Sequence, residues 1–344
     1  MAAAPDERLH RELTALAGRG SGVRDFAAGA ARVLRRVVGF DGYCLITLDP
    51  ASRIPTGEVV EDALPHEATL RMAEIELNGE DVNRFDALAR TGSLTAGLAE
   101  ATGGILARSS RHREVRAPHG FGDELRAALV GGGAAWGGMT LLRTADRDHF
   151  SPADTRTLAA VVPLLADGLR RAVLRTSQPV PAREPPGLLL LTRDGELEES
   201  NPAGEEWLRA LAVDEGLPAV VTGVAVRARR GDDARARAQS PSGTWLLVRG
   251  AALGDRTAVV IEPAGSHELA ALAADGYDLT TRERAVAQLV AEGLPTDAIA
   301  GRLHLSPWTV QDHLKSIFAK VGVGTRGELV ARLFFAHEPP ALTR

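Results

Sequence analysis

The chain has 344 residues, 44% hydrophobic and 25% charged, values that are ordinary for a soluble protein of two or three domains. Its single cysteine, Cys44, excludes a disulfide framework, a four-thiolate metal site and an Fe–S cluster, and favours a reducing compartment. The net charge of -5 argues against general affinity for nucleic acid. The N-terminus has no apolar core of signal-peptide length, and no apolar run is long enough to span a bilayer. We therefore expect a cytoplasmic protein without contact to a membrane.

Residues 1–175 predict an α+β domain. Tyr43–Asp49 alternates enough to form a strand, and Glu124–Arg143 predicts two strands joined at Gly131–Gly133, because glycine tolerates positive φ in a hairpin turn. Ser151, followed by proline, is a good N-cap for a long helix. A sheet closed by a long exit helix resembles a GAF domain, and this resemblance implies a sensory domain for small molecules.

Residues 176–186 form a proline-rich segment that predicts an extended linker. In residues 187–263 the pattern "DGELEESNPA" combines a hairpin signal at Asp194–Gly195 with an N-cap at Asn201. This opening resembles that of a small PAS domain, which implies a second sensory α+β domain. Residues 264–276 predict a short connecting helix, at Ser266–Gly276.

Residues 277–337 predict an all-α domain of four short helices. The pairs Thr280–Glu283 and Thr325–Glu328 have the spacing of capping boxes, and Ser306 followed by proline caps the third helix. The second and third helices, joined by a tight turn, form a helix-turn-helix. Residues 276–337 hold seven basic and six acidic side chains, so this part is only mildly basic, at +1.

The third helix, Ser306–Lys320, contains the two lysines of the chain, Lys315 and Lys320. Its apolar stripe leaves Gln311, Asp312 and Lys315 facing outward, near the start of the helix, where a recognition helix meets base edges in the major groove.

The stretch Leu279–Phe334 resembles the LuxR-type DNA-binding domain of bacterial transcriptional regulators. The resemblance rests on "LT-x-RE", "EGL", "IA-x-x-L", "LSP-x-TV-x-x-HL", "I-x-x-K-x-GV" and "R-x-EL". It implies a fourth helix, Arg326–Phe335, that forms a homodimer, and double-stranded promoter DNA as partner. The residues that we accordingly expect to contact DNA are Thr296, Ser306, Trp308, Thr309, Gln311, Asp312, Lys315 and Lys320, and those expected to contact a second copy are Leu329, Val330, Leu333 and Phe334.

Each of these roles has a simpler alternative. The alternative for Lys315 and Lys320 is that of ordinary solvated charges on a helix. The alternative for Trp308 is packing over the turn, to which it is equally suited. For His313 a packed, hydrogen-bonded side chain is favoured over a titrating switch. Asp312 either reads the exocyclic amine of a cytosine or pairs with Lys315 or Arg302.

The first 275 residues offer few signs of chemistry. His112 and His119 lie seven positions apart in what we expect to be a polar surface loop, which is a poor metal site. The stretch "GGGAAWGG" lacks the spacing and lysine of a phosphate loop. No Ser/His/Asp or paired-carboxylate arrangement requires catalysis, and we expect neither enzyme activity nor a cofactor. A small molecule or a partner protein is the expected signal.

The sequence thus predicts a multidomain protein with an α+β GAF-like domain, a small α+β PAS-like domain and an all-α helix-turn-helix domain. Its predicted function is that of a DNA-binding transcriptional regulator whose sensory domains modulate promoter binding. A sigma factor is disfavoured, because sheet patterns stand where a second DNA-binding helical region would be needed. A signalling adaptor that acts through protein contacts remains the main alternative, in line with the weak charge of the last segment.

Overall fold

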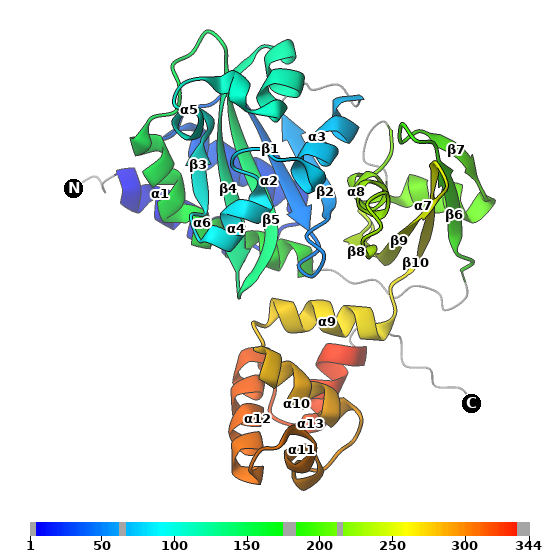
Figure 1. Cartoon of the computed structure of the whole chain (residues 1–344). Coiled ribbons are helices and arrows are strands. Elements are labelled where there is room, and N and C mark those ends of the chain that lie inside the picture. The colour runs from blue at the N-terminus through cyan, green and yellow to red at the C-terminus, as the bar shows by residue number, and fades with distance from the viewer. Residues whose placement is uncertain (1–4, 62–66, 175–183, 212–215, 336–344) are drawn as a thin grey trace.

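Two sheet-containing domains are followed by a helical domain (Figure 1). The structure is a computed structural model, and it describes residues 5–61, 67–174, 184–211 and 216–335. The α+β class of the first domain and the helical class of the last confirm the predicted fold at this level. Most of the predicted proline-rich linker lies outside the described residues. Within those ranges no helix has both the length and the hydropathy needed to span a bilayer.

The first domain contains a five-stranded antiparallel sheet in the order β2-β1-β5-β4-β3. The predicted strand at Tyr43–Asp49 is β1, and the predicted hairpin is β4 and β5, joined at two glycines with positive φ, Gly132 and Gly133. The strands are β1 (Gly42–Leu48), β2 (Pro55–Glu61), β3 (Thr95–Gly97), β4 (Phe121–Gly131) and β5 (Ala134–Thr144).

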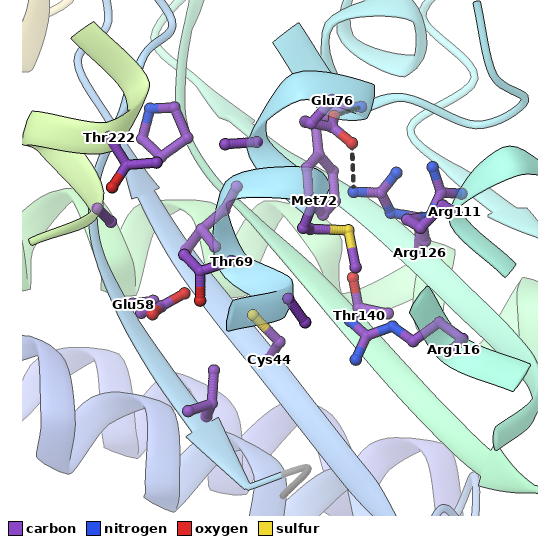
Figure 2. A pocket seen from close by; sticks show the side chains of 17 residues that line it. Cys44, Glu58, Thr69, Met72, Glu76, Arg111, Arg116, Arg126, Thr140 and Thr222 are labelled. Atoms are coloured by element: carbon purple, nitrogen blue, oxygen red, sulfur yellow. Dashed lines mark hydrogen bonds and ion pairs between the residues drawn. The ribbon is translucent and has the colours of Figure 1, made fainter. Parts of the chain in front are cut away.

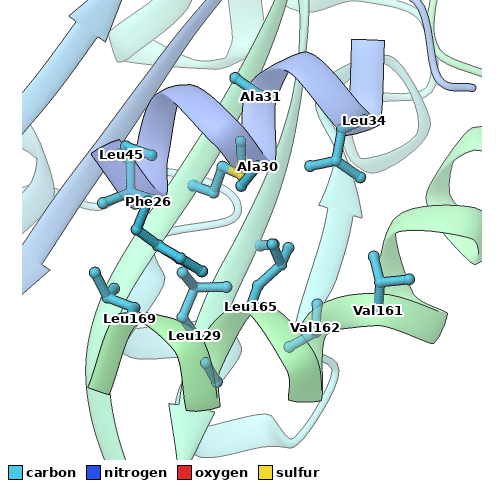
Figure 3. Packing of buried hydrophobic residues seen from close by; sticks show 14 of the residues in the cluster. Phe26, Ala30, Ala31, Leu34, Leu45, Leu129, Val161, Val162, Leu165 and Leu169 are labelled. Atoms are coloured by element: carbon cyan, nitrogen blue, oxygen red, sulfur yellow. The ribbon is translucent and has the colours of Figure 1, made fainter. Parts of the chain in front are cut away.

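Three helices cover one face of this sheet: α1 (Pro5–Gly18), α2 (Val23–Arg35) and α6 (Pro152–Leu174) (Figure 1). Figure 3 shows Phe26 and Leu34 of α2 facing Leu165 of α6 above the sheet residue Leu129, and all four are almost fully buried. Burial of a large apolar side chain contributes about 1.5–3 kcal/mol, so this layer is the main stabilising core of the domain.

The other face is covered by short helices: α3 (Glu67–Asn78), α4 (Phe85–Thr91), α5 (Leu98–Thr102) and the single turns η1 (Leu106–Arg108), η2 (His112–Arg116) and η3 (Ala117–His119). The prediction of a polar surface loop here holds for His119, which is exposed, but is wrong for the part around His112. His112 is only 9% exposed and Arg111 only 1%, because the segment packs against charged residues of β4.

The second domain repeats the strand order of the first, with a sheet ordered β7-β6-β10-β9-β8. Asn201 caps the first helix as predicted, since its Oδ1 accepts a hydrogen bond of 2.7 Å from the Gly204 N–H. The elements are β6 (Gly187–Leu191), β7 (Leu197–Ser200), α7 (Pro202–Leu211), α8 (Ala219–Ala228), β8 (Ala234–Gln239), β9 (Trp245–Leu253) and β10 (Arg256–Pro263).

The cores of the first two domains interpenetrate. Ile54, from the β1–β2 turn of the first domain, is fully buried in the core of the second. It packs against Gly223 of α8, where a Cβ atom would lie 2.7 Å from the Ile54 Cγ2. In the reverse direction, Trp245 of β9 and Leu272 join the core of the first domain. The two domains therefore form one packed body.

The predicted connecting helix is α9 (Ser266–Gly276), which lies between the sheet domains and the C-terminal helices (Figure 1). Those helices are α10 (Thr281–Ala291), α11 (Thr296–Leu303), α12 (Pro307–Val321) and α13 (Arg326–Val330), the last continuing into a π-helical turn, η4 (Ala331–Phe335). The Thr280–Glu283 capping box is confirmed. At Thr325 only half of the box forms, because the Glu328 carboxylate accepts the Gly324 N–H instead.

Candidate nucleic-acid interface

The turn between α11 and α12 is fixed by backbone geometry and a side-chain cap. His304 ends α11 in the left-handed region, at φ 53°, and the Leu305 N–H then returns to the Ala300 carbonyl at 2.9 Å. Ser306 Oγ accepts a hydrogen bond of 3.0 Å from the Thr309 N–H, and Pro307 begins the helix, as predicted. Ser306 and Thr309 thus set the direction in which α12 leaves the turn.

The start of α12 presents an exposed face. Val310 and Leu314 point into the domain core, at 0% and 6% exposure, which leaves Gln311 and Lys315 in solvent on the other side. Trp308 is 70% exposed and does not pack over the turn. An indole left in water on the first turn of a helix-turn-helix is suited to contact with a partner surface.

Asp312 lies beside Lys315, and their Oδ1 and Nζ atoms are 3.4 Å apart. The two side chains are 45% and 74% exposed, so the pair contributes less than about 1 kcal/mol to stability. The simpler alternative for Asp312, an ion pair with Lys315, is therefore formed in the free protein. The geometry leaves the lysine free to move to a phosphate or a base.

Lys320 differs from Lys315 in the free protein, because it already has partners within the domain; its contact with DNA stays a prediction. Its Nζ is 2.7 Å from Glu283 Oε2 and also donates to the Asp278 carbonyl at 2.9 Å. The ammonium thus joins α12 to the start of α10. The Lys320 side chain is 31% exposed and that of Glu283 5%, so the ion pair stands at the domain surface with its carboxylate buried.

Glu283 is the centre of this network. Its carboxylate accepts hydrogen bonds from the Thr280 N–H at 2.7 Å, from Ser316 Oγ at 2.6 Å and from Lys320. Burial alone would raise the pKa of Glu283, but Lys320, Ser316 and Thr280 outweigh it and hold the pKa at about 2. Ionised Glu283 therefore stabilises the folded domain.

Glu283→Gln is expected to lower the free energy of unfolding of the C-terminal domain by about 2–3 kcal/mol at pH 7. Because the folded pKa of about 2 lies below the ordinary 4.5, this contribution is complete above about pH 5 and is lost as the pH falls toward 2. The difference between wild type and variant, measured by urea unfolding at each pH, should shrink across that window. Glu292→Gln, at an exposed position, is the control, and a constant difference across the window would contradict this role.

Thr296, also predicted to contact DNA, begins α11 and is half-buried. Its Oγ1 accepts a hydrogen bond of 2.7 Å from Arg326 Nη2, while Arg326 Nη1 donates to the Leu294 carbonyl at 3.1 Å. Arg326 of the fourth helix thereby fixes the start of α11.

The fourth helix is less available than predicted. Leu329 and Leu333 are 0% and 1% exposed in the core of the C-terminal domain, so they do not offer a surface to a second copy, and this part of the prediction is corrected. Val330 and Phe334 are half-buried against the same core. The amphipathic pattern of this helix reflects packing within the domain.

Residues 278–333 match the family model "Bacterial regulatory proteins, luxR family". The C-terminal domain belongs to this family. An HTH-type transcriptional regulator of Mycobacterium tuberculosis (strain ATCC 25618 / H37Rv) is 40% identical over 117 residues, which are 34% of this chain and 12% of that protein. The transcriptional regulatory protein UhpA of Escherichia coli (strain K12) is 45% identical over 56 residues, 16% of this chain and 29% of UhpA. The matches thus span a minor part of these relatives.

Among solved structures, the phycocyanobilin-bound GAF domain of a cyanobacterial phytochrome covers 50% of this chain and 98% of its own. The identity is 18% and the TM-score 0.37. A TM-score this low supports no conclusion about what the first domain binds.

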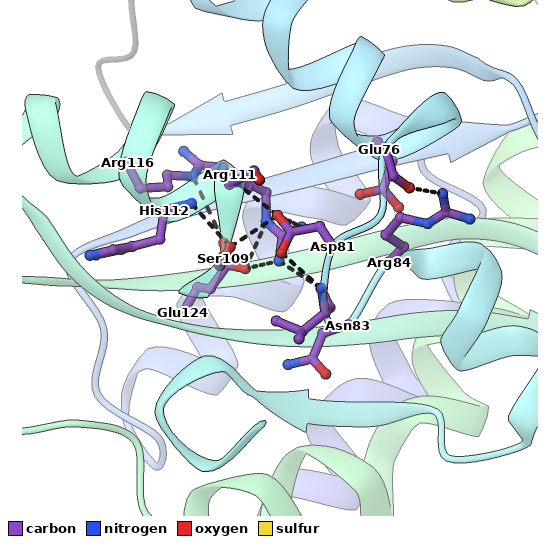
Figure 4. Close-up of polar contacts among 12 residues, drawn as sticks. Glu76, Asp81, Asn83, Arg84, Ser109, Arg111, His112, Arg116 and Glu124 are labelled. Carbon is purple, nitrogen blue, oxygen red and sulfur yellow. Dashed lines mark hydrogen bonds and ion pairs between the residues drawn. The ribbon is translucent and has the colours of Figure 1, made fainter. Parts of the chain in front are cut away.

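Sequence reasoning missed a buried charged cluster in the first domain (Figure 4). Arg111 Nε donates to Glu124 Oε1 at 2.8 Å, and Asp81 Oδ2 accepts from the Arg111 N–H at 2.8 Å and from Ser109 Oγ at 3.0 Å. The sequence signal for this cluster was the alternation in β4, where Glu124 and Arg126 share one face of the strand and Leu125, Ala127 and Leu129 share the other. No group of three or more His, Cys, Asp or Glu side chains in the described ranges is placed to hold a metal ion.

Proposed function

We propose that this chain is a non-enzymatic, cytoplasmic DNA-binding transcriptional regulator, in which a GAF-like and a PAS-like domain modulate promoter binding by the LuxR-type domain. The observation that carries the proposal is the exposed face of α12, with Trp308, Gln311 and Lys315 in solvent on a helix-turn-helix of the luxR family. The two sheets of identical strand order support a pair of related sensory domains.

A gel-shift assay with the DNA upstream of the protein's own gene, at one fixed salt concentration, tests the proposal. Saturable binding that survives competition by unrelated duplex is expected. The alternative, an adaptor that acts through protein contacts, is favoured by the net charge of only +1 over residues 276–337. If binding to every duplex tried is equally weak, the adaptor is the better account.

We further propose that DNA is bound by a homodimer. A single copy with few cations neutralises few phosphates and binds weakly at physiological salt, whereas two copies add their contacts. Since Leu329 and Leu333 are buried, the dimer surface would be formed by the outer side of the fourth helix, around the exposed residue Ala331 and its half-buried neighbours Val330 and Phe334.

Ala331→Glu is expected to weaken the dimer and reduce affinity for a two-fold symmetric site by at least about tenfold, because it places a charge at the contact without touching the domain core. Sedimentation equilibrium and gel shift on the same samples measure both effects. Gln288→Glu, on the exposed side of α10, is the matched control. A variant that stays dimeric with unchanged affinity would show that the contact lies elsewhere.

A further inference from the structure

A cavity of about 110 Å³ lies over the sheet of the first domain, on the side of the charged cluster (Figure 2). Its floor includes Cys44 of β1 and Thr140 of β5, which are paired neighbours in the sheet. Helix α3 forms its roof. The cavity has a charged end and an apolar end, and the two differ in what they can bind.

At the charged end stand Arg111, Arg116 and Arg126, which are 1%, 4% and 3% exposed. Arg111 is held by Glu124 and Asp81. The Nε atom of Arg116 lies 3.9 Å from Glu124 Oε2. From there the side chain extends toward Thr140 and Cys44 in Figure 2. Its guanidinium therefore forms part of the cavity wall.

Arg126 uses two of its three side-chain nitrogen atoms in hydrogen bonds among the described residues. Its Nη1 and Nη2 donate to the Asn83 carbonyl and to Glu76 Oε2, both at 2.9 Å, and its guanidinium lies 3.7 Å from the centre of the Phe85 ring. The buried Nε–H has no hydrogen-bond partner among the described residues. Burial and the nearby charge of Arg111 lower the pKa of Arg126, so an additional anion beside it would be stabilised.

The two carboxylates that line the cavity, Glu58 and Glu76, do not accept a hydrogen bond from the Arg126 Nε–H. Glu76 is engaged by Arg126 and by the Phe85 N–H at 2.6 Å. Glu58 lies at the opposite end of the cavity from the arginines in Figure 2. At Arg126, therefore, a ligand in the cavity can supply the acceptor that the Nε–H lacks among the described residues.

The apolar end is lined by Ile46, Val60, Met72 and Phe85. A cavity of about 150 Å³ accepts benzene, so the whole cavity of about 110 Å³, its charged end included, suits a small molecule of a few carbon atoms. Methionine adapts its shape to such groups. A long chain or a large ring system would not fit without a change in structure.

The second domain closes one side, because Ala219 and Thr222 of α8 also line the cavity. Helix α8 packs on both α3 and β2. A molecule in this cavity would therefore touch both sheet domains, and its binding energy would depend on how they are placed relative to each other.

We propose that this cavity binds a small organic carboxylate, with the carboxylate against Arg116 and Arg126 and a short branched apolar group against Met72 and Phe85. That this ligand acts as the signal of the regulator rests on the proposed function. That it binds to this cavity does not.

Isothermal titration calorimetry of the full chain without DNA tests the proposal. The probes are propionate, isobutyrate, isovalerate and benzoate, with isovaleramide and isopentylamine as uncharged and cationic counterparts of isovalerate. Saturable binding by at least one carboxylate is expected, and binding of the amide and the amine should be at least about tenfold weaker than that of isovalerate. Equal binding of the three counterparts, or no saturable binding by any carboxylate, would overturn the proposal.

Two variants locate the site. Arg116→Met is expected to weaken carboxylate binding by at least about tenfold, while Arg113→Met, on the same helical turn with a half-exposed side chain, leaves it unchanged. Met72→Trp fills the apolar end without altering any charge and is expected to abolish binding, which keeps the test decisive if Arg116→Met does not fold. Unchanged affinity in Met72→Trp would place the ligand elsewhere. The gel shift of the wild-type protein without any carboxylate tests DNA binding, so failure of the proposed function can be told apart from failure of ligand binding.

Discussion

Arg237→Met is expected to lower the free energy of unfolding of the two sheet domains by about 3–5 kcal/mol, the usual cost of leaving a buried charge without its partner. Arg237 of β8 and Asp49 at the end of β1 are 7% and 3% exposed. The Asp49 carboxylate accepts hydrogen bonds from Arg237 Nε at 2.8 Å, from Nη2 at 3.0 Å and from the Arg237 N–H at 2.8 Å. Burial raises the pKa of Asp49, but Arg237 outweighs it and keeps the carboxyl ionised.

The same arginine connects the sheet domains to the C-terminal helices. Its Nη1 donates to the Glu268 carbonyl of α9 at 3.0 Å, and its Nη2 lies 3.9 Å from Asp275 Oδ2 near the end of that helix. Asp275 in turn pairs with Arg284 of α10. A change in the relative placement of the sheet domains therefore has a route of direct contacts to the helix-turn-helix.

Urea unfolding, followed by tryptophan fluorescence, measures the effect of Arg237→Met, because Trp136 and Trp245 lie in the core of the first domain and Trp207 in that of the second. Arg235→Met is the matched control, since Arg235 lies on the same strand, has a 64%-exposed side chain and pairs with the exposed Asp233. Two separate transitions in the variant, in place of one, would show that the pair holds the domains together. A loss no larger than that of the control would show that the interface is sustained by Ile54 and its apolar neighbours alone.

Local signals predicted most of the secondary structure, because caps and turns depend on residues close in sequence. Ser306, Asn201 and the Thr280–Glu283 pair all form the hydrogen bonds that their spacing indicates. The failure at Thr325 is also local, since the Glu328 carboxylate has two amides within reach and takes that of Gly324.

Contacts between distant residues could not be predicted in this way. Ile54 fills the core of another domain, and Arg237 finds its carboxylate 188 positions earlier in the chain. For the same reason the segment around His112 was misjudged: its arginines are polar by type, yet Glu124 and Asp81 provide partners for burying them. Leu333 shows the converse case, in which an apolar stripe fits a dimer contact as well as a domain core, and only the packing distinguishes the two.

Lys315→Ala is expected to weaken binding to the best DNA site by about tenfold or more. In the proposed complex the exposed lysine faces base edges and phosphates at the start of α12, and the proposed dimer carries it twice. Asp312→Ala is expected to act differently. The carboxylate repels phosphates, so its removal should leave non-specific binding equal or tighter, even though Lys315 loses the neighbour that lies 3.4 Å away in the free protein.

What Asp312 contributes is then selectivity, since a carboxylate in the groove accepts a hydrogen bond from the exocyclic amine of cytosine, worth roughly 1–3 kcal/mol of discrimination. Binding-site selection with wild type, Lys315→Ala and Asp312→Ala at one salt concentration separates the roles. Asp312→Ala should relax the preference at one base pair in each half-site, whereas Lys315→Ala should lower affinity for the selected site. If Asp312→Ala selects the same sequence with the same stringency, the carboxylate serves only to hold Lys315, and specificity rests on Gln311 and its exposed neighbours.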